Sequence, residues 1–337
     1  MKKLVYLFLL LPALVLAQSA NQNYIKSITY KEPSTVLLTS PSVSQAQITV
    51  MYMDGLGRPL QQIAVQQSGT GQNIVTPITY DSFGRQYKDY LPVPMSSTSL
   101  NYSDNLNVIS DPTSYYTNKY GNDGNFRYSE KKIEKSPLNR VLEEGAPGAD
   151  WSLSNGHTIK MDYSTNVADE VKLYKALVNA TNNLTVVLSQ NPTHYPAESL
   201  YKSVVKDENW STSASKNHTT EEFKNKEGQV VLKRTYSENE PHDTYYVYDQ
   251  YGNLSYVIPP LADNPSNAAV LNGLCYQYRY DSRNRLVEKK LPGKDWEFIV
   301  YDKLDRVVAT GPVYSPFGTE INGWSVTKYD VFSRPVL

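Results

Sequence analysis

The sequence Tyr278-Arg279-Tyr280-Asp281-Ser282-Arg283-Asn284-Arg285-Leu286-Val287 reads as two short strands joined by a tight turn. Tyr278 and Tyr280 alternate with polar neighbours, as residues on one face of a strand do. The Asp281 carboxylate can accept hydrogen bonds from the backbone just downstream, and Asn284 belongs to the few residue types that adopt a positive φ at low cost. Arg285 then opens a second strand. The stretch therefore predicts a β-hairpin built around a type I turn.

The same pattern recurs along the chain at three linked positions. A short polar residue opens each turn, a residue that tolerates positive φ follows three positions later, and the next position is usually arginine. The opening residues are Asp54, Asp81, Ser136, Asn225, Asp249, Asp281, Asp302 and Asp330. The residues three positions later are Gly57, Gly84, Asn139, Gly228, Gly252, Asn284, Asp305 and Ser333. The position after these holds Arg58, Arg85, Arg140, Gln229, Asn253, Arg285, Arg306 and Arg334.

A tyrosine stands directly before the turn in five of the eight units, as Tyr80, Tyr248, Tyr280, Tyr301 and Tyr329. Agreement at linked positions indicates a repeat architecture rather than isolated turns. We expect the opening residue to fix the turn and the tyrosines to pack across the sheet. We expect each arginine to pair with the turn aspartate of a neighbouring unit, because such pairs are charge-assisted.

The Tyr-Asp-x-x-Gly-Arg units resemble the YD repeats of RHS proteins. Further motifs resemble the N-terminal region of RHS-repeat proteins of the Bacteroidetes type, namely residues 53–59, 136–143, 146–148, 156–160, 220–224 and 246–254, with Pro259-Pro260. The resemblance covers roughly residues 25 to 337. It implies that the hairpins wind into part of a hollow shell. In that family the shell encloses a C-terminal, often toxic, domain that is released by self-cleavage.

Composition supports a sheet protein and excludes some classes of partner. The 337 residues include 28 tyrosines and 20 prolines, and tyrosine is a strand-favouring residue. The 33 basic and 34 acidic residues give a net charge of −1. The chain therefore lacks the excess of basic residues that would indicate nucleic-acid binding. The predicted fold class is all-β, with an irregular N-terminal β region followed by YD-type β-hairpin repeats that form part of a spiralling sheet or shell.

The chain divides into five predicted segments. Residues 1–17 read as a signal peptide, since two lysines precede an apolar run that ends at Val15-Leu16-Ala17. Residues 18–47 form a polar segment, and residues 48–150 an N-terminal β region with early YD-like units. Residues 151–220 form an inserted β region, in which residues 169–177 are expected to be a strand. Residues 221–337 form the repeat array, which we expect to be cut short.

Within the N-terminal β region, residues 91–123 are rich in Ser, Asn, Asp and Tyr and contain three prolines. Such composition is typical of long surface loops. We therefore expect residues 91–123 to run over the surface.

No motif indicates catalysis or a cofactor. The histidines His157, His194, His218 and His242 are scattered, and neither nucleophile-elbow nor phosphate-loop patterns occur. Cys275 is the single cysteine, which excludes an internal disulfide, and we expect it to be a small buried apolar residue. Turn geometry explains the repeat aspartates without an acid–base role. We expect no cofactor, no metal and no enzymatic activity.

Three functional hypotheses remain open. The first is a secreted structural protein, the front part of an RHS-type β shell whose partners are a downstream RHS core and an effector region. The second is a cell-surface binding module for a glycan or a protein, with Trp151, Trp210, Trp296 and Trp324 as contact residues. The third is an enzyme such as a glycan hydrolase, which requires two carboxylates in a cleft.

The expected location follows from the signal peptide. We expect export to the cell surface or beyond, with the periplasm as the alternative. Because no second apolar stretch of spanning length follows, we expect no membrane span once the signal is removed.

Overall fold

The computed structural model describes residues 22–95, 99–110, 114–179, 186–189, 192–314 and 322–336. The predicted signal peptide, residues 1–17, lies outside them. The chain forms two compact units, Met1–Lys160 and Met161–Leu337. The division falls inside strand β9 (Ile159–Thr165), close to the predicted start of the inserted region at residue 151.

The first unit is a run of antiparallel strands. Four strands pair in chain order: β1 (Asn23–Tyr30), β2 (Ala46–Met53), β3 (Pro59–Ala64) and β4 (Asn73–Thr79). β4 then pairs with both β5 (Lys88–Tyr90) and β6 (Val93–Met95). The ladder continues from β5 to β7 (Tyr128–Ile133), β8 (Val141–Gly145) and the start of β9.

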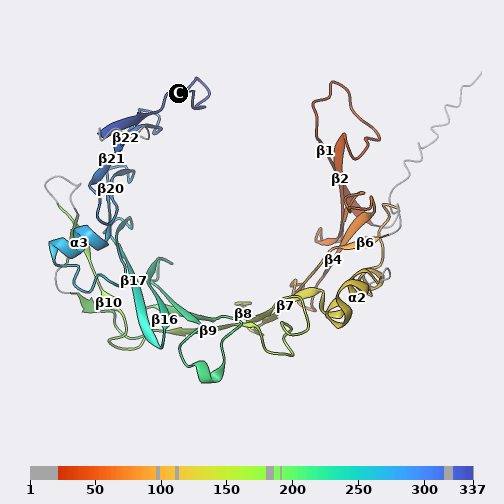
Figure 1. Cartoon of the computed structure of the whole chain (residues 1–337), viewed down its shortest axis with the longest axis horizontal. Coiled ribbons are helices and arrows are strands. Elements are labelled where there is room, and N and C mark those ends of the chain that lie inside the picture. The colour runs from red at the N-terminus through yellow and green to blue at the C-terminus, as the bar shows by residue number, and fades with distance from the viewer. Residues whose placement is uncertain are drawn as a thin grey trace, which may run out of the picture. The chain divides into compact units, whose positions relative to one another are not determined.

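The expectation of a surface excursion over residues 91–123 is wrong. This segment holds α1 (Asn105–Ile109), α2 (Tyr115–Tyr120) and the start of the 3₁₀ helix η1 (Gly121–Phe126), and α2 lies beside β6 (Figure 1). Val108 and Tyr116 are buried against Val50, Tyr52 and Val75 of the strands. The apolar residues of the segment follow no strand or helix period, so its polar composition concealed the three that enter the core, Val93, Val108 and Tyr116.

The second unit continues the same architecture. In the large sheet, the strands that follow β9 are β14 (Tyr201–Lys206), β15 (Thr219–Lys224), β16 (Val230–Ser237), β17 (Glu240–Tyr248), β18 (Leu254–Ile258), β19 (Tyr276–Tyr280), β20 (Leu286–Lys290), β21 (Trp296–Tyr301), β22 (Val307–Tyr314) and β23 (Asn322–Val326). Each is antiparallel to the next in this order. A short 3₁₀ helix, η2 (Thr212–Ala214), precedes β15.

One face of the second unit is covered by segments that are not repeats. Two small antiparallel pairs replace the single strand expected over residues 169–177: β10 (Lys172–Leu173) with β13 (Thr193–His194), and between them in the chain β11 (Ala176–Val178) with β12 (Val186–Leu188). Helix α3 (Ala268–Leu274) lies on the same side of the strands as β10 (Figure 1). Between cover and sheet lie Phe223, Leu232, Val247, Tyr256 and Cys275. The expected all-β fold class is confirmed, and the described residues add three short α-helices and two 3₁₀ helices to the strands.

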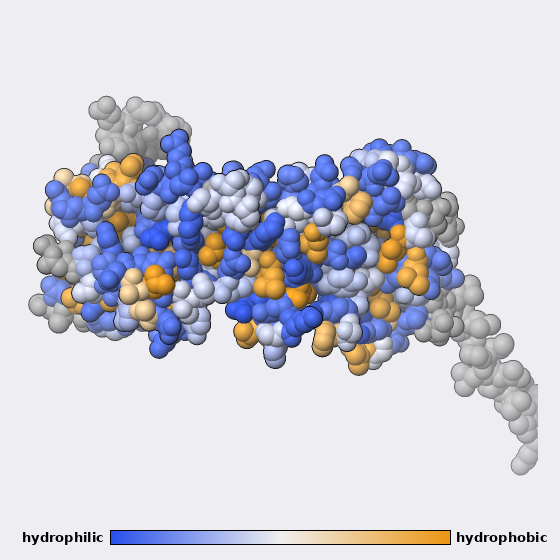
Figure 2. Space-filling view, turned by 90° about the horizontal axis from the view of Figure 1, so that it is seen from below, coloured by the Kyte–Doolittle hydropathy of each residue, from blue (hydrophilic) through white to orange (hydrophobic). Residues whose placement is uncertain are grey.

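Two surface properties accompany this fold. In the described part of the chain no helix is long and apolar enough to cross a bilayer. The face in Figure 2 is mostly hydrophilic, with hydrophobic residues in small groups.

Shortening a core residue tests the packing of the second unit. Leu232 is fully buried in its central cluster, so Leu232→Ala is expected to lower the free energy of unfolding by about 2–5 kcal/mol in urea titrations. Val187→Ala, at an exposed position of β12, is the control and should change it by less than about 0.5 kcal/mol. Equal effects of the two changes would contradict the assigned core.

Candidate functional site

Each repeat turn is closed by two backbone hydrogen bonds. In the Asp281 turn, the Asp281 N–H donates to the Arg285 carbonyl and the Asn284 N–H donates to the Asp281 carbonyl, both at 3.0 Å. The strand register shifts by one residue next to the turn. These features define a three-residue hairpin loop, a type I turn followed by a bulge at a residue of positive φ. All eight residues of that slot have positive φ, from 53° to 84°: Gly57, Gly84, Asn139, Gly228, Gly252, Asn284, Asp305 and Ser333.

The turn aspartate is held by its own unit. Asp281 Oδ1 accepts the backbone N–H of Arg283 and of Arg285, and Oδ2 accepts Arg285 Nε at 2.8 Å. The same set of contacts recurs at Asp54, Asp81, Asp302 and Asp330. The expected pairing with an arginine of a neighbouring unit is therefore wrong for the aspartate. The arginine opens the return strand, and its side chain folds back over its own turn.

These contacts keep the turn carboxylates ionised. At Asp54, Asp81, Asp302 and Asp330 the backbone N–H of the following arginine lowers the pKa most; desolvation opposes it and the arginine side chain lowers the pKa further. At Asp281 desolvation is the largest influence and raises the pKa, but the hydrogen bonds from Arg285 and Arg283 outweigh it. Both oxygens of each ionised carboxylate already accept hydrogen bonds from the turn, so the carboxylate stabilises the turn as an acceptor.

The same arginine also reaches the next turn. The guanidinium carbon of Arg285 lies 4.7 Å from the ring centre of Tyr301. Nη1 of the same side chain donates a hydrogen bond to Asp305 Oδ1 of the following turn. Arg306 repeats both contacts, 4.7 Å from the Tyr329 ring and 3.2 Å from Ser333 Oγ. The arginine therefore joins two successive turns with one side chain.

In the first unit the link has the same form. Arg58 lies 4.5 Å from the Tyr80 ring, and a Cβ added at Gly84 would come within 2.6 Å of Arg58 Nη1. Arg85 Nη1 donates to Asn139 Oδ1 at 2.9 Å. Each contact again runs from an arginine to the residue of positive φ in the next turn.

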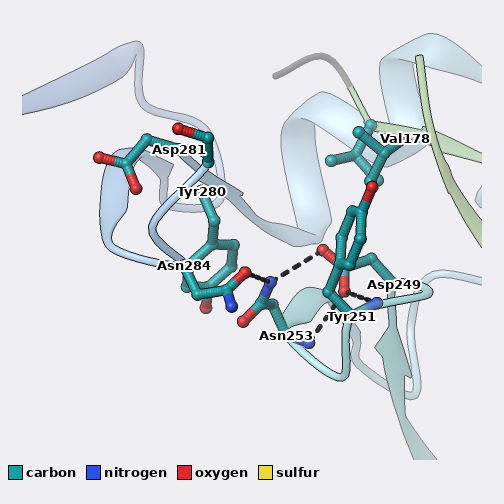
Figure 3. Close-up of a pocket in the computed structure, with 9 residues that line it drawn as sticks. Val178, Asp249, Tyr251, Asn253, Tyr280, Asp281 and Asn284 are labelled. Carbon is teal, nitrogen blue, oxygen red and sulfur yellow. Dashed lines mark hydrogen bonds between the residues drawn. The ribbon is translucent and has the colours of Figure 1, made fainter. Parts of the chain in front are cut away.

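Amide side chains replace arginine in two units and keep the link. Asn253 Nδ2 donates both to Asp249 of its own turn (3.2 Å) and to Asn284 Oδ1 of the next turn (3.1 Å), as Figure 3 shows. Gln229 Nε2 donates to the Gly252 carbonyl at 3.0 Å. The role of the position therefore depends on an N–H donor long enough to reach the next turn.

The tyrosine that precedes five of the turns connects the repeats in the opposite direction. The Tyr280 hydroxyl donates to the Leu254 carbonyl at 3.0 Å, and Leu254 follows the arginine-equivalent position of the preceding unit. The equivalent pairs are Tyr80 with Pro59, Tyr248 with Val230, Tyr301 with Leu286 and Tyr329 with Val307, at 2.8–3.0 Å. We call this row of turns, with its arginine and tyrosine links, the turn seam. Each of the two compact units has such a seam.

The Ser136 unit uses a different carboxylate. Here the Glu134 N–H donates to the Arg140 carbonyl, and the Glu134 carboxylate accepts Arg140 Nε and Nη2 at 3.1 and 2.9 Å. The Arg140 side chain, followed by the Ser136 hydroxyl, lowers the pKa of Glu134 to about 2. Sequence alignment of the turns missed Glu134 because it stands two positions before the opening residue. The sequence signal that could have revealed it is an acidic residue two positions before Ser136-Pro137.

A small pocket opens beside the seam of the second unit (Figure 3). It holds about 180 Å³ and is lined by Val178, Tyr251, Asp249, Asn253 and further turn residues. The Asp249 carboxylate accepts the backbone N–H groups of Tyr251 and Asn253. The Asp249 carboxylate, which lines the pocket, is thus already hydrogen-bonded within its own turn.

The four tryptophans do not gather in one place. Trp151, in the first unit, lies 5.8 Å from His157, and Trp210 donates its Nε1–H to the Ser215 carbonyl. The Arg279 guanidinium lies 4.0 Å from the Trp296 ring, and Trp324 lies nearly parallel to Phe298 with 6.5 Å between ring centres.

Sequence analysis missed a buried ionic network on β14–β17. The fully buried Glu221 lies 2.7 Å from Lys216 and 3.1 Å from Lys202, and Lys202 also binds Glu170 at 2.6 Å. Desolvation raises the pKa of Glu221, but its two lysine partners outweigh that effect and lower it. The signal was alternation of charged residues on strands that also carry core residues.

Within the described ranges no three His, Cys, Asp or Glu side chains come together as a metal site. Cys275 is fully buried, and burial raises the pKa of its thiol to about 11. The thiol is therefore protonated at neutral pH.

The fold and the turn seam define an antiparallel β-hairpin repeat protein. Residues 26–165 match the family model described as "Domain of unknown function (DUF6443)". No curated protein gives a significant sequence match.

Solved structures with a similar fold come from Tc toxin complexes. TcdB2-TccC3-TEV and TcdB2-TccC3-Cdc42 are 15% and 16% identical to this chain and cover 88% and 86% of it, each with a TM-score of 0.51. A Tc holotoxin pore of Photorhabdus luminescens is 14% identical, covers 85% and also has a TM-score of 0.51. The chain spans 12% of the length of each of these proteins. At this identity the likeness concerns the fold.

Removing one tyrosine hydroxyl tests the seam. Tyr280→Phe leaves the Leu254 carbonyl without its donor and should lower the free energy of unfolding by about 1 kcal/mol in urea titrations. Tyr251→Phe is the matched control, because the Tyr251 ring is exposed on the same hairpin row, and it should be neutral. A neutral Tyr280→Phe would contradict the assigned link.

Acid should weaken the seam. The lowered pKa of Glu134 and of the turn aspartates gives a contribution to stability that is complete above pH 4.5 and is lost as the pH falls toward 2. Glu134→Gln removes its share, so the fall in melting temperature between pH 5 and pH 2.5 should be smaller in this variant. The exposed Glu240→Gln is the control, and an identical pH profile for all three proteins would refute the assignment.

Proposed function

We propose that this chain is an exported, non-enzymatic structural protein that forms the front part of an RHS-type β shell. The observation that supports the proposal is the turn seam, which joins successive hairpins through the same contacts each time. A structure extended by repetition can enclose a volume that a single sheet cannot. The shell relationship and the Bacteroidetes-type motifs together favour this role.

The Arg334 side chain is more exposed than the equivalent arginines of the seam. Arg334 binds Asp330 at 2.7 Å, yet its side chain is 72% exposed, whereas Arg58, Arg85, Arg285 and Arg306 are 21–38% exposed. Pro335 occupies the position whose carbonyl accepts a tyrosine hydroxyl from the following unit elsewhere. A further hairpin with Tyr-Asp at its turn would fit both groups.

In this proposal the downstream RHS core and an effector complete the device. The predicted signal peptide, residues 1–17, directs the chain out of the cytoplasm to the cell surface or beyond. The repeat carboxylates serve as turn acceptors, which fits a shell better than a hydrolase.

Adding one repeat should engage Arg334. We would join a copy of residues 286–312 directly after Arg334, which supplies a tyrosine, a turn and a residue of positive φ at the spacing found after Arg285. Arg334→Gln should be nearly neutral in the parent chain and should lower the melting temperature in the extended chain. As a control, the extension carries phenylalanine and alanine in place of its Tyr-Asp pair. If Arg334→Gln has the same effect in all three proteins, the last turn does not accept a further unit.

The shell role itself is tested with the whole reading frame. A continuation in frame beyond Leu337 should encode further repeats and a C-terminal region that resists protease in the full-length protein. Deleting residues 22–160 should open the shell and make that region sensitive. Equal digestion with and without the front part would reject enclosure.

A further inference from the structure

Beside helix α2 and the 3₁₀ helix η1, the first unit contains a pocket that the turn seam does not use. It holds about 360 Å³, within the range of about 300–1,000 Å³ that is usual for small-molecule sites. We call it the tyrosine pocket, and its lining includes Tyr115, Tyr116, Tyr120, Asp123, Phe126 and Gly148. These residues belong to segments that leave the strand ladder, and all lie within the matched family domain.

One buried tyrosine fixes the aromatic wall of the pocket. The Tyr116 hydroxyl donates to the Pro92 carbonyl at 2.6 Å, and its ring meets Tyr115 edge-on, with 5.1 Å between ring centres. The Tyr120 ring is inclined by 23° to that of Tyr116, at 6.2 Å. Tyr115 and Tyr120 are 40% and 52% exposed, whereas Tyr116 is 8% exposed. Two exposed rings are thus held in place by a third before any ligand binds.

Another wall is closed by the turn that follows β8. The Gly148 N–H donates to the Phe126 carbonyl at 2.8 Å, and Asp123 Oδ1 accepts the Ala149 N–H at 3.2 Å. Asp123 is exposed, and a carboxylate has about four acceptor positions, so it keeps capacity for the hydroxyl groups of a ligand. A Cβ added at Gly148 would lie 3.2 Å from the Trp151 ring, so one of the predicted contact tryptophans lies against this wall.

A second, more open pocket adjoins the tyrosine pocket at α2. It holds about 390 Å³ and is lined by Gln72, Pro94, Tyr115, Asn118 and Lys119. Tyr115 lines both pockets, so the two are neighbouring parts of one surface. The two amide side chains offer donors and acceptors, and the lysine offers donors. Lys119 Nζ lies 5.7 and 5.3 Å from the ring centres of Tyr115 and Tyr120, which places a donor beside the aromatic wall.

We propose that the two pockets together bind an oligosaccharide, with one sugar unit in the tyrosine pocket and the next beside Asn118. The C–H groups on the face of a sugar ring pack against aromatic rings, which Tyr115 and Tyr120 present. The hydroxyl groups at the edge of the sugar need hydrogen-bond partners, which Asp123 and Asn118 supply. The proposal goes beyond the shell role and does not depend on it.

Other classes of ligand fit these side chains less well. Aromatic clusters also bind organic cations. Here Lys119 and Arg127 already place positive charge at the three tyrosine rings, and this charge would repel a cation. A purely apolar ligand would remove water from Asp123 and Lys119 without replacing its hydrogen bonds, which is costly. A sugar has both an apolar face and hydroxyl groups.

An array of neutral and acidic oligosaccharides, probed with the labelled full chain at micromolar concentration, tests the site. We expect binding to a subset of the array, and calorimetry with a bound oligosaccharide then compares variants. Tyr120→Ala should weaken binding at least tenfold, because it removes a stacking ring, whereas Tyr120→Phe keeps the ring and should weaken binding less than threefold. Asn118→Ala should weaken binding of the oligosaccharide and leave that of its single sugar unit unchanged.

The matched control is Tyr201→Ala, because Tyr201 is 65% exposed in the second unit and lines neither pocket. Urea midpoints near that of the parent chain would establish that each variant is folded. Four results would overturn the proposal: no glycan bound on the array, glycan binding that Tyr120→Ala leaves unchanged, equal effects of Asn118→Ala on oligosaccharide and single sugar, or binding of tetramethylammonium in place of sugars.

Discussion

The arginine after the repeat turn makes two sets of contacts with one side chain in four units, as Arg58, Arg85, Arg285 and Arg306. Its Nε–H and backbone N–H hold the carboxylate of its own turn, while Nη1 and the flat guanidinium face meet the next turn and its tyrosine. The planar, forked guanidinium reaches both turns at once and stacks on the tyrosine, whereas lysine is a point charge without a stacking face. In the units that have arginine, the guanidinium therefore makes the contact between successive hairpins.

The exceptions show which part of the contact is indispensable. Asn253 has no charge and no stacking face, yet its amide still donates to both turns. Glu134 replaces the turn carboxylate from two positions further away and still binds Arg140. What persists is the bond to a carboxylate or amide of the same turn. The identity of the donor varies with what the next turn presents.

Much of the fold could be predicted from sequence because turn chemistry is local. A residue of positive φ must be glycine, asparagine or aspartate in most cases, so the eight turns were visible without any knowledge of contacts. The direction of each arginine was not visible, because the linear order of Asp281 and Arg285 does not tell whether a pair forms within a turn or between turns. Register and bulge decide that question.

Other features depended on contacts between distant residues. The cover of the first unit comes from isolated apolar residues such as Val108 in a polar stretch, which no periodicity marks. Glu221 of β15 meets Lys202 of the neighbouring strand β14 and Lys216 of the turn before β15, and only the strand register brings the three side chains together. The sequence offered all four tryptophans as candidate contact residues. It could not show that the Trp324 ring lies against Gly311.

The central claim is that each arginine stabilises the following turn as well as its own. The most direct measurement is residue-resolved hydrogen exchange of the Arg285→Gln variant, with the exposed Lys303→Gln as control. The account predicts faster exchange of the amides of Asp302 and Asp305, whose hydrogen bonds close the next turn, together with those of the Asp281 turn. Faster exchange confined to the Asp281 turn, with the next turn unchanged, would contradict it.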